Sequence, residues 1–216
     1  MQLQIAPSIL SADFSNLGKD IEMLNKYADI IHLDIMDGTF VPNISFGFPV
    51  VEAVSKIASI PMDAHLMVVH PERWFERLAA DGVSYVSFHL EAAGRRTSAL
   101  IGQIHSLGMK AGVAINPDIE VSKLFPYIGK ADFFLIMSVF AGFGGQKFIY
   151  ESLDRIATLR AEITRRGCEA LIEVDGGVSE SNASALRQSG ADVLVAGSSV
   201  FRSDDPLAAM AALRQA

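Results

Sequence analysis

Eight short apolar runs alternate along this chain with longer segments of helical periodicity. The runs are rich in β-branched and aromatic residues, which is typical of buried strands. We predict strands at residues 3–6, 29–35, 62–67, 85–89, 110–115, 133–139, 170–174 and 193–196. Apolar periodicity and glycine stops predict helices at residues 14–27, 72–80, 98–107, 153–166, 181–188 and 206–215, with shorter ones at 50–57 and 121–127. Asp13 is the expected N-cap of the first helix.

The order of these elements limits the fold to very few choices. Strands that alternate with helices pair in parallel, because each return connection is a helix. Eight such units in 216 residues leave no room for a second domain or a long linker. We therefore predict one α/β domain over residues 1–216, folded as a (β/α)8 TIM barrel of parallel strands. The alternative is an open doubly wound sheet, which the lack of a Gly-x-Gly-x-x-Gly turn after the first strand disfavours.

Composition removes several classes of function. Half of the residues are hydrophobic and 20% are charged, which excludes a disordered chain. The formal net charge of −7 makes non-specific nucleic-acid binding a poor hypothesis. The single cysteine, Cys168, excludes an internal disulfide and a multi-thiolate metal site. The first residues do not resemble a signal peptide, and no run of about 18 apolar residues occurs, so we expect a cytoplasmic protein without a membrane partner.

Polar residues with metal-ligand chemistry collect where the strands are predicted to end. In a barrel of this type, the active site lies at the C-terminal ends of the strands. His32 and Asp34 are two residues apart on one predicted strand, so they point to the same face, and His65 and Asp175 lie on two other strands. Two imidazoles and two carboxylates suit a divalent transition metal better than Ca²⁺ or Mg²⁺. A His-x-Asp pair alone is more often structural, but four such residues together favour a metal site.

Glycines gather at the ends of the last three predicted strands. They lie in residues 142–145, in Gly176-Gly177 and at Gly197-Ser198. Main-chain N–H groups exposed there, next to helix starts, can bind phosphate without many basic side chains. The alternative is that these glycines only serve turns, but three neighbouring clusters favour a phosphate site.

Asp34 and Asp175 belong to the second and seventh predicted strands, on opposing sides of the ring. A small substrate between them would present a different face to each carboxylate. One carboxylate could then remove a proton next to a carbonyl while the other reprotonates the opposite face, with a metal polarising the developing enediolate. The pattern favours an epimerase or racemase.

Several motifs of the chain resemble the ribulose-phosphate 3-epimerase family, in the family's order and over essentially the whole chain. They are residues 6–13, 32–38, 40–44, 63–67, 142–146 and 173–177. The resemblance implies an isomerase of the pentose phosphate pathway that interconverts D-ribulose 5-phosphate and D-xylulose 5-phosphate through a 2,3-enediolate. It also implies a homo-oligomer, either a dimer or a hexamer.

The resemblance assigns roles to particular residues. It implies one divalent transition metal ion per subunit (Zn²⁺, Fe²⁺, Mn²⁺ or Co²⁺), held by His32, Asp34, His65 and Asp175. In one direction Asp34 is the proton acceptor and Asp175 the proton donor. The implied substrate-binding residues are Ser8, His32, Met36, His65, Met67, Met137, Gly142, Phe143, Gly144, Gly145, Gly176, Gly177, Gly197 and Ser198. Core filling is an equally good explanation of the three methionines. His89 receives no ligand role and is expected in the core or at the rim.

One departure from the family pattern stands out. The family usually has a polar residue and then proline before Gly-Phe-Gly-Gly, whereas this chain has Phe140-Ala141. The missing proline frees φ at the loop's entry, which leaves the loop's dynamics and the exact sugar open. D-allulose 6-phosphate is the alternative substrate, although residues 43–47 and the Gly-Gly after Asp175 resemble the pentose enzymes.

Two further alternatives belong to other classes of protein. A metal-independent phosphate-barrel decarboxylase or lyase would need a lysine among the strand-end carboxylates, and no predicted strand end carries one. A non-catalytic sugar-phosphate binding barrel would be favoured by a missing ligand or carboxylate, but all four are present.

Overall fold

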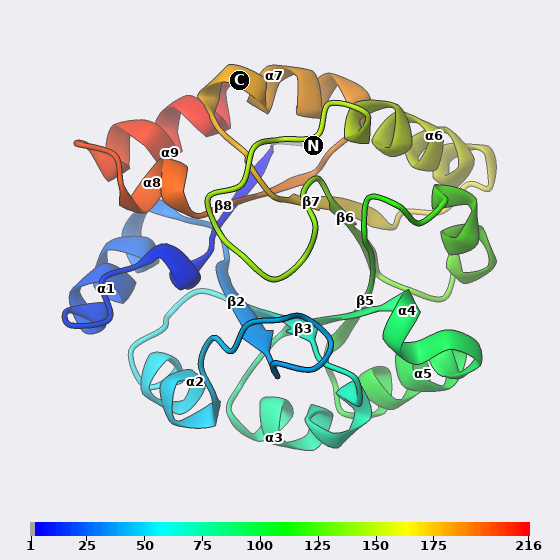
Figure 1. The fold of residues 1–216 in the computed structure, drawn as a ribbon, viewed down its shortest axis with the longest axis horizontal. Helices are drawn as coiled ribbons and strands as arrows, with labels where there is room; N and C mark the ends of the chain where they lie inside the picture. Colours follow the sequence, from blue (N-terminus) through cyan, green and yellow to red (C-terminus); the bar gives the residue numbers. More distant parts are fainter. Residues whose placement is uncertain (1–2) are drawn as a thin grey trace.

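Eight parallel strands form the wall of a barrel within residues 3–216, the part of the chain that the computed structural model describes (Figure 1). They are β1 (Gln4–Pro7), β2 (Ile31–Met36), β3 (Met62–Met67), β4 (Tyr85–His89), β5 (Lys110–Ile115), β6 (Phe133–Met137), β7 (Leu171–Asp175) and β8 (Val193–Ala196). From β2 to β8 each strand pairs with the next along the sequence, and β1 pairs with β8. A parallel bridge between Ser8 and His32 joins β1 to β2, so the ring closes. The predicted (β/α)8 barrel is confirmed.

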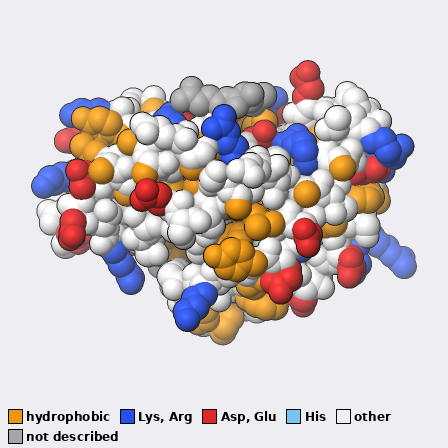
Figure 2. Space-filling view, turned by 90° about the horizontal axis from the view of Figure 1, so that it is seen from above, with side chains coloured by type: hydrophobic (Ala, Val, Ile, Leu, Met, Phe, Trp, Pro, Cys, Tyr) orange, Lys and Arg blue, Asp and Glu red, His pale blue; other side chains and the backbone are white. Residues whose placement is uncertain are grey.

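Helices surround the strands on the outside of the barrel (Figure 1). The α-helices are α1 (Leu17–Tyr27), α2 (Phe48–Ser55), α3 (Phe75–Ala80), α4 (Leu90–Ala93), α5 (Thr97–Ser106), α6 (Ser152–Arg165), α7 (Glu180–Ser189), α8 (Ser198–Phe201) and α9 (Pro206–Gln215). Short 3₁₀ helices occupy Ile9–Ser11, Pro71–Arg73, Gly94–Arg96 and Val121–Tyr127. Among the helices of residues 3–216, none is long and apolar enough to cross a membrane. Acidic and basic side chains are interspersed over the face seen in Figure 2.

The predicted helix boundaries differ from the structure where local hydrogen bonds compete with the helix. The expectation that Asp13 caps the first helix is wrong, because its carboxylate accepts hydrogen bonds from the backbone and hydroxyl of Ser15, and α1 begins only after Asn16. Helices α4 and α8 were not predicted, since four residues are too few to show a helical period.

Alternation along the strands sorts side chains between two environments. On β2, the side chains of Ile31 and Leu33 belong to the apolar core between strands and helices, and both are fully buried. His32 and Asp34, on the opposite face, point into the barrel. The predicted placement of this polar pair inside the barrel is therefore confirmed.

The wall of the barrel also contains a position without space for a side chain. A Cβ added to Gly112 on β5 would lie 2.3 Å from the ring of Phe133 on β6. The buried Phe133 ring thus takes the space that a side chain at residue 112 would need. Close packing of this kind makes even a methyl group costly.

We predict that Gly112→Ala lowers the free energy of unfolding by about 1–3 kcal/mol, because Phe133 must move. Urea unfolding of the two proteins measures the change. Gly102→Ala is the matched control: an added Cβ at this position on α5 meets no atom within 4 Å. There the higher helix propensity of alanine should stabilise the protein by up to about 1 kcal/mol. Equal stability of Gly112→Ala and the wild type would contradict the packing argument.

Candidate active site

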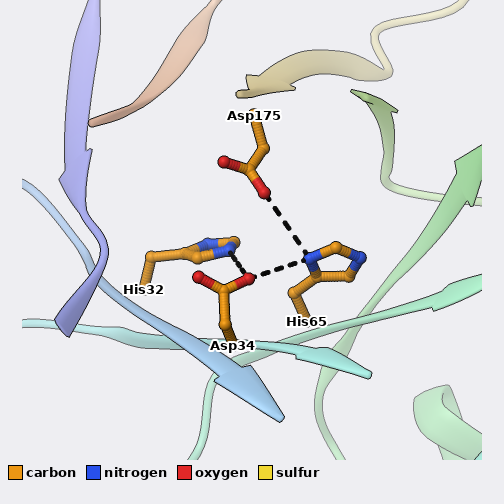
Figure 3. Close-up of side chains that lie close together, drawn as sticks. All are labelled: His32, Asp34, His65 and Asp175. Carbon is orange, nitrogen blue, oxygen red and sulfur yellow. Dashed lines mark hydrogen bonds and ion pairs between the residues drawn. The ribbon is translucent and has the colours of Figure 1, made fainter. Parts of the chain in front are cut away.

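Four side chains from three strands converge inside the barrel (Figure 3). We call them the quartet: His32, Asp34, His65 and Asp175. Asp34 Oδ1 lies 3.4 Å from His32 Nε2 and 3.2 Å from His65 Nδ1. Asp175 Oδ2 lies 3.8 Å from His65 Nδ1. One ligand atom from each residue lies within 4.8 Å of the others. The structure therefore brings together the four residues that the sequence nominated as a metal site.

The strand register explains this convergence. Asp34 on β2 is paired with His65 on β3, so both side chains leave the sheet at one level. Asp175 is the last residue of β7. In the ring β7 is separated from β2 by β8 and β1, so the side chain of Asp175 approaches from across the barrel. The sequence placed the two carboxylates on opposing sides, and the structure places their strands three steps apart.

The donor set fits a transition metal ion. His32 Nδ1 lies 2.6 Å from Asp63 Oδ2 and donates its proton there, while Nε2 faces Asp34. Nε2 is buried and has no hydrogen-bond partner. A buried imidazole nitrogen without a partner, beside a second imidazole and two carboxylates, has the chemistry of an unfilled ligand position.

Two further acids, Asp63 and Glu173, lie beside His32 Nδ1, and neither was predicted from the sequence. Asp63 bonds to His32, and Glu173 Oε1 lies 3.5 Å from His32 Nδ1. Burial, together with the neighbouring Asp63, raises the pKa of Glu173 to about 8, so Glu173 holds a proton at neutral pH. The signal was available: Asp63 stands two residues before His65, and Glu173 two before Asp175, on the same strand faces.

The two carboxylates of the quartet differ in protonation. Burial opposes ionisation of Asp34, but His32 and His65 outweigh it and hold the pKa of Asp34 well below its usual range. Burial, with the negative charge of Asp34 nearby, raises the pKa of Asp175 to about 7. Near neutral pH, Asp34 is thus ionised while Asp175 is poised between its two forms. Carboxylates held apart in this way suit opposite acid and base roles.

The two imidazoles also differ. Burial lowers the pKa of His65 to about 4, so its ring is neutral at physiological pH. Burial acts in the same sense on His32, but Asp34 and Asp63 outweigh it and raise the pKa of His32 well above its ordinary value. These two acids favour a proton on each ring nitrogen of His32, and a metal ion bound at Nε2 would take the place of one of them.

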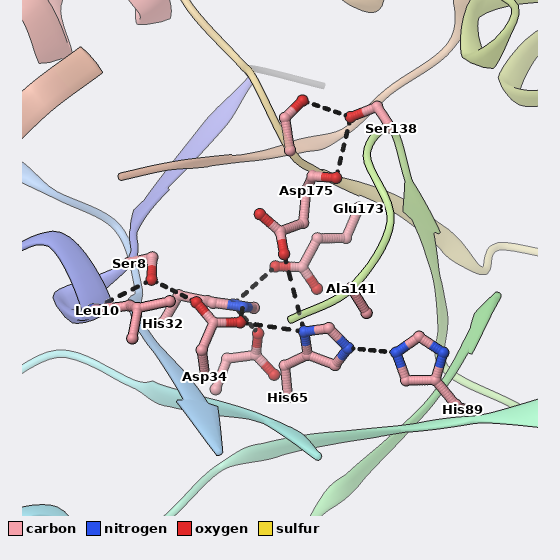
Figure 4. Close-up of polar contacts among 12 residues, drawn as sticks. Ser8, Leu10, His32, Asp34, His65, His89, Ser138, Ala141, Glu173 and Asp175 are labelled. Atoms are coloured by element: carbon pink, nitrogen blue, oxygen red, sulfur yellow. Dashed lines mark hydrogen bonds and ion pairs between the residues drawn. The ribbon is translucent and has the colours of Figure 1, made fainter. Parts of the chain in front are cut away.

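Hydroxyl groups fix Asp34 from two sides. Ser8 Oγ donates to Asp34 Oδ2 at 2.5 Å, and Ser45 Oγ donates to the Asp34 carbonyl at 2.5 Å. Ser138 Oγ donates to the carbonyls of Asp175 (2.9 Å) and Gly176 (2.7 Å) at the end of β7 (Figure 4). These contacts hold the carboxylates through both side chain and backbone.

A cavity opens above the quartet at the C-terminal ends of the strands. Asp34 and Asp175 line it, while His32 and His65 lie fully buried below it. It is also lined by the other substrate-binding candidates, namely Ser8, Met36, Met67, Met137, Gly142, Phe143, Gly144, Gly145, Gly176, Gly177, Gly197 and Ser198. The sequence prediction that these residues share one site is consistent with this geometry.

The mouth loop, which we define as residues 140–146 between β6 and α6, lies over this cavity. Asn43 Nδ2 donates to the Gly142 carbonyl at 2.8 Å and ties the loop to the segment after β2. A Cβ added to Gly177 would lie 2.5 Å from the Phe148 nitrogen. Glycine at residue 177 thus lets the chain after the mouth loop approach the end of β7 closely.

His89 is fully buried, and its ring lies beside His65. His65 Nε2 and His89 Nε2 are 2.9 Å apart (Figure 4). The family resemblance gave His89 no ligand role and placed it in the core or at the rim, and the structure places it in the core. His89 faces His65 from the neighbouring strand and takes no part in the quartet.

A parallel barrel whose acids and imidazoles meet at a glycine-lined cavity at the C-terminal strand ends has the architecture of a (β/α)8-barrel enzyme. The fold is similar to 3-hexulose-6-phosphate synthase, with a TM-score of 0.73 and 20% identity over 100% of this chain and 99% of that one. It is also similar to orotidine 5'-phosphate decarboxylase from Pyrococcus horikoshii OT3, with a TM-score of 0.68 and 13% identity over 98% and 97% of the two chains. At such identities the likeness concerns the fold alone.

Sequence relatives narrow the class to one family. Residues 4–201 match the model of the ribulose-phosphate 3 epimerase family. The chain is 42% identical to ribulose-phosphate 3-epimerase of Bacillus subtilis (strain 168), over 98% of each protein. It is 43% identical to the enzyme of that name from Synechocystis sp., over 97% of this chain and 92% of the relative. The chain belongs to the ribulose-phosphate 3-epimerase family and is an isomerase.

Glu173 generates a pH-dependent prediction for the chelator-treated protein. Its pKa rises from an ordinary value of 4.5 to about 8 on folding, so only the folded state keeps the proton between these values. The free energy of unfolding should therefore fall as pH rises from about 5 to 8, by about 1.4 kcal/mol per pH unit from this group. Glu173→Gln cannot titrate and should remove that part of the slope, measured by urea unfolding at several pH values.

Glu169→Gln, at an exposed position just before the same strand, is the matched control and should keep the wild-type slope. A Glu173→Gln protein with the wild-type dependence on pH would show that Glu173 is ionised in the folded state.

Proposed function

We propose that this protein interconverts D-ribulose 5-phosphate and D-xylulose 5-phosphate by inverting carbon 3. The observation that carries the proposal is that two carboxylates, the buried Asp34 and the partly buried Asp175, line one cavity beside two buried imidazoles. Family membership supplies the substrate class. The geometry supplies two acid–base groups that reach one small substrate.

We infer that His32, Asp34, His65 and Asp175 hold one divalent transition metal ion, of the class Zn²⁺, Fe²⁺, Mn²⁺ or Co²⁺. When bound, such an ion would supply Lewis-acid polarisation of the carbonyl at carbon 2. The neutral ring of His65 and the unpartnered Nε2 of His32 support this assignment. The hydrogen bond from His32 to Asp63 would orient that ring for the ion.

The proton transfers are assigned to the two aspartates. Asp34 takes the proton from carbon 3 of ribulose 5-phosphate, and the electron pair of the C–H bond forms the 2,3-enediolate. Asp175 then gives a proton to the opposite face of carbon 3, which yields xylulose 5-phosphate; the reverse reaction exchanges the two roles. The hydrogen bond from Ser8 to Asp34 holds the accepting carboxylate in place.

Glycine backbone around the cavity suits the phosphate group of the substrate. The segments 142–145, Gly176-Gly177 and Gly197-Ser198 all line the cavity. Main-chain N–H groups can bind the phosphate there, which explains how an acidic chain accepts an anionic substrate. Met36, Met67 and Met137, all buried, form an apolar wall that keeps water from the enediolate.

Separate incubations with ribulose 5-phosphate and with D-allulose 6-phosphate in D₂O test the reaction. We expect xylulose 5-phosphate that carries deuterium at carbon 3, detected by NMR. Asp175→Asn should fold normally but lower turnover about 10²- to 10⁴-fold, because the proton donor is lost. Asp154→Asn, on the exposed face of α6, is the matched control and should keep wild-type turnover. Exchange into D-allulose 6-phosphate alone would make the hexose the substrate, and exchange into neither would leave a binding protein.

Metal removal tests the assignment of the quartet. Treatment with a strong chelator should lower turnover more than about 100-fold, since loss of several kcal/mol of Lewis-acid stabilisation has at least that effect. Added Mn²⁺, Co²⁺, Zn²⁺ or Fe²⁺ should restore it. His65→Gln should not be restored, whereas His105→Gln, at an exposed site on α5, should behave as wild type. Full turnover by protein shown to be free of metal would exclude the metal from the reaction.

A further inference from the structure

A hydrogen-bonded chain leads from the quartet to the mouth loop. His65 presents Nδ1 to Asp34 and Asp175, and its other nitrogen, Nε2, lies 2.9 Å from His89 Nε2. His89 Nδ1 in turn lies 3.4 Å from Glu91 Oε1. Both rings are fully buried. Figure 4 shows the two rings lying edge to edge, and neither residue lines the cavity.

The positions of the protons follow from these contacts. Two Nε2 atoms at 2.9 Å can share only one proton, so one ring donates and the other accepts. If His65 Nδ1 is a metal ligand, its Nε2 carries the proton and donates to His89. His89 must then carry its own proton on Nδ1, where the Glu91 carboxylate accepts it. Glu91 thus selects the tautomer of His89, and His89 selects that of His65.

Asn116, just after β5, extends the chain. Its main-chain N–H and its Nδ2 both donate to Glu91 Oε1, at 3.0 and 2.9 Å. Its Oδ1 accepts the Ala141 N–H at 2.9 Å. Arg155 from α6 donates to the Asn116 carbonyl at 2.8 Å and to the Met137 carbonyl at 3.0 Å. Asn116 is therefore held on three sides.

The last link exists because residue 141 is not proline. Proline has no N–H and could not donate to Asn116. The Phe140-Ala141 sequence thus adds a hydrogen bond between the mouth loop and the support of His65. The loop carries Gly142 to Gly145, which line the cavity.

We propose that Glu91 and His89 are positioning residues that fix the tautomer of His65 for metal binding, and that Asn116 couples them to the mouth loop through the Ala141 amide. The proposal rests on the metal assignment under the proposed function. In this arrangement the imidazole of His89 orients His65, whereas the carboxylate of Asp63 orients His32.

Co²⁺ binding to chelator-treated protein tests the proposal without any sugar substrate. Affinity is measured by competition with a chelator, and coordination by the visible absorption of bound Co²⁺. His89→Phe keeps a ring against Phe40, which packs on His89 at a centroid distance of 4.7 Å, but removes both nitrogens. We expect it to weaken Co²⁺ binding about 10- to 100-fold and to change the spectrum.

If His89→Phe fails to fold, Glu91→Gln provides the second measurement, since Glu91 is partly exposed. This variant should weaken Co²⁺ binding several-fold. His105→Phe is the same substitution at an exposed position that takes no part in these hydrogen bonds, and this variant should bind Co²⁺ as the wild type does. If folded His89→Phe and Glu91→Gln both keep wild-type affinity and spectrum, the positioning role is wrong. So it is if the wild type binds no Co²⁺.

The coupling is tested by Ala141→Pro, alone and combined with His89→Phe. Removal of the N–H should weaken Co²⁺ binding in the wild-type background and have little further effect in the His89→Phe background. Fully additive effects would overturn the coupling. A protein without epimerase activity whose Co²⁺ affinity still depends on His89 would refute the proposed function while supporting the positioning chain.

Discussion

Burial of ionisable groups inside a parallel barrel is the constraint on which the site depends. The barrel interior holds the acids Asp34, Asp63, Glu173 and Asp175 beside the rings of His32, His65 and His89. An unpaired charge there would cost several kcal/mol, so each group is either paired or keeps a proton. Asp34 is ionised because two imidazoles face it, and Glu173 is neutral because burial and the neighbouring Asp63 both oppose its ionisation. The difference in protonation between Asp34 and Asp175 is therefore a result of burial and of the charged groups around each carboxyl.

Much of the fold could be read from the sequence because barrel strands are short, apolar and regularly spaced. The strands at 62–67, 85–89, 110–115 and 193–196 have the predicted bounds. The quartet could be predicted because His32 and Asp34 alternate on one strand. The contact between His65 and His89 could not, since it depends on how two neighbouring strands and their side-chain rotamers align. The start of α1 was missed because Asp13 bonds to Ser15, a competition that propensity does not show.

The departure at residues 140–141 gains a physical meaning from the structure. Without proline, the loop's entry has a free φ, but it also has an N–H that Asn116 accepts. The loop therefore exchanges a conformational restraint within the backbone for a hydrogen bond to a neighbouring segment. Phe140 and Phe143 remain half exposed beside the cavity. The two phenylalanines make the entrance apolar although the floor of the site is charged.

β1 and β2 form no regular ladder, and the one isolated bridge between them joins Ser8 and His32, which both belong to the site. The least regularly paired junction of the ring thus runs beside the candidate metal site. An ion held by His32 and Asp34 on one side of that junction and by Asp175 on the other would link the two sides. Binding of the ion would then oppose separation of the first two strands and stabilise the folded barrel.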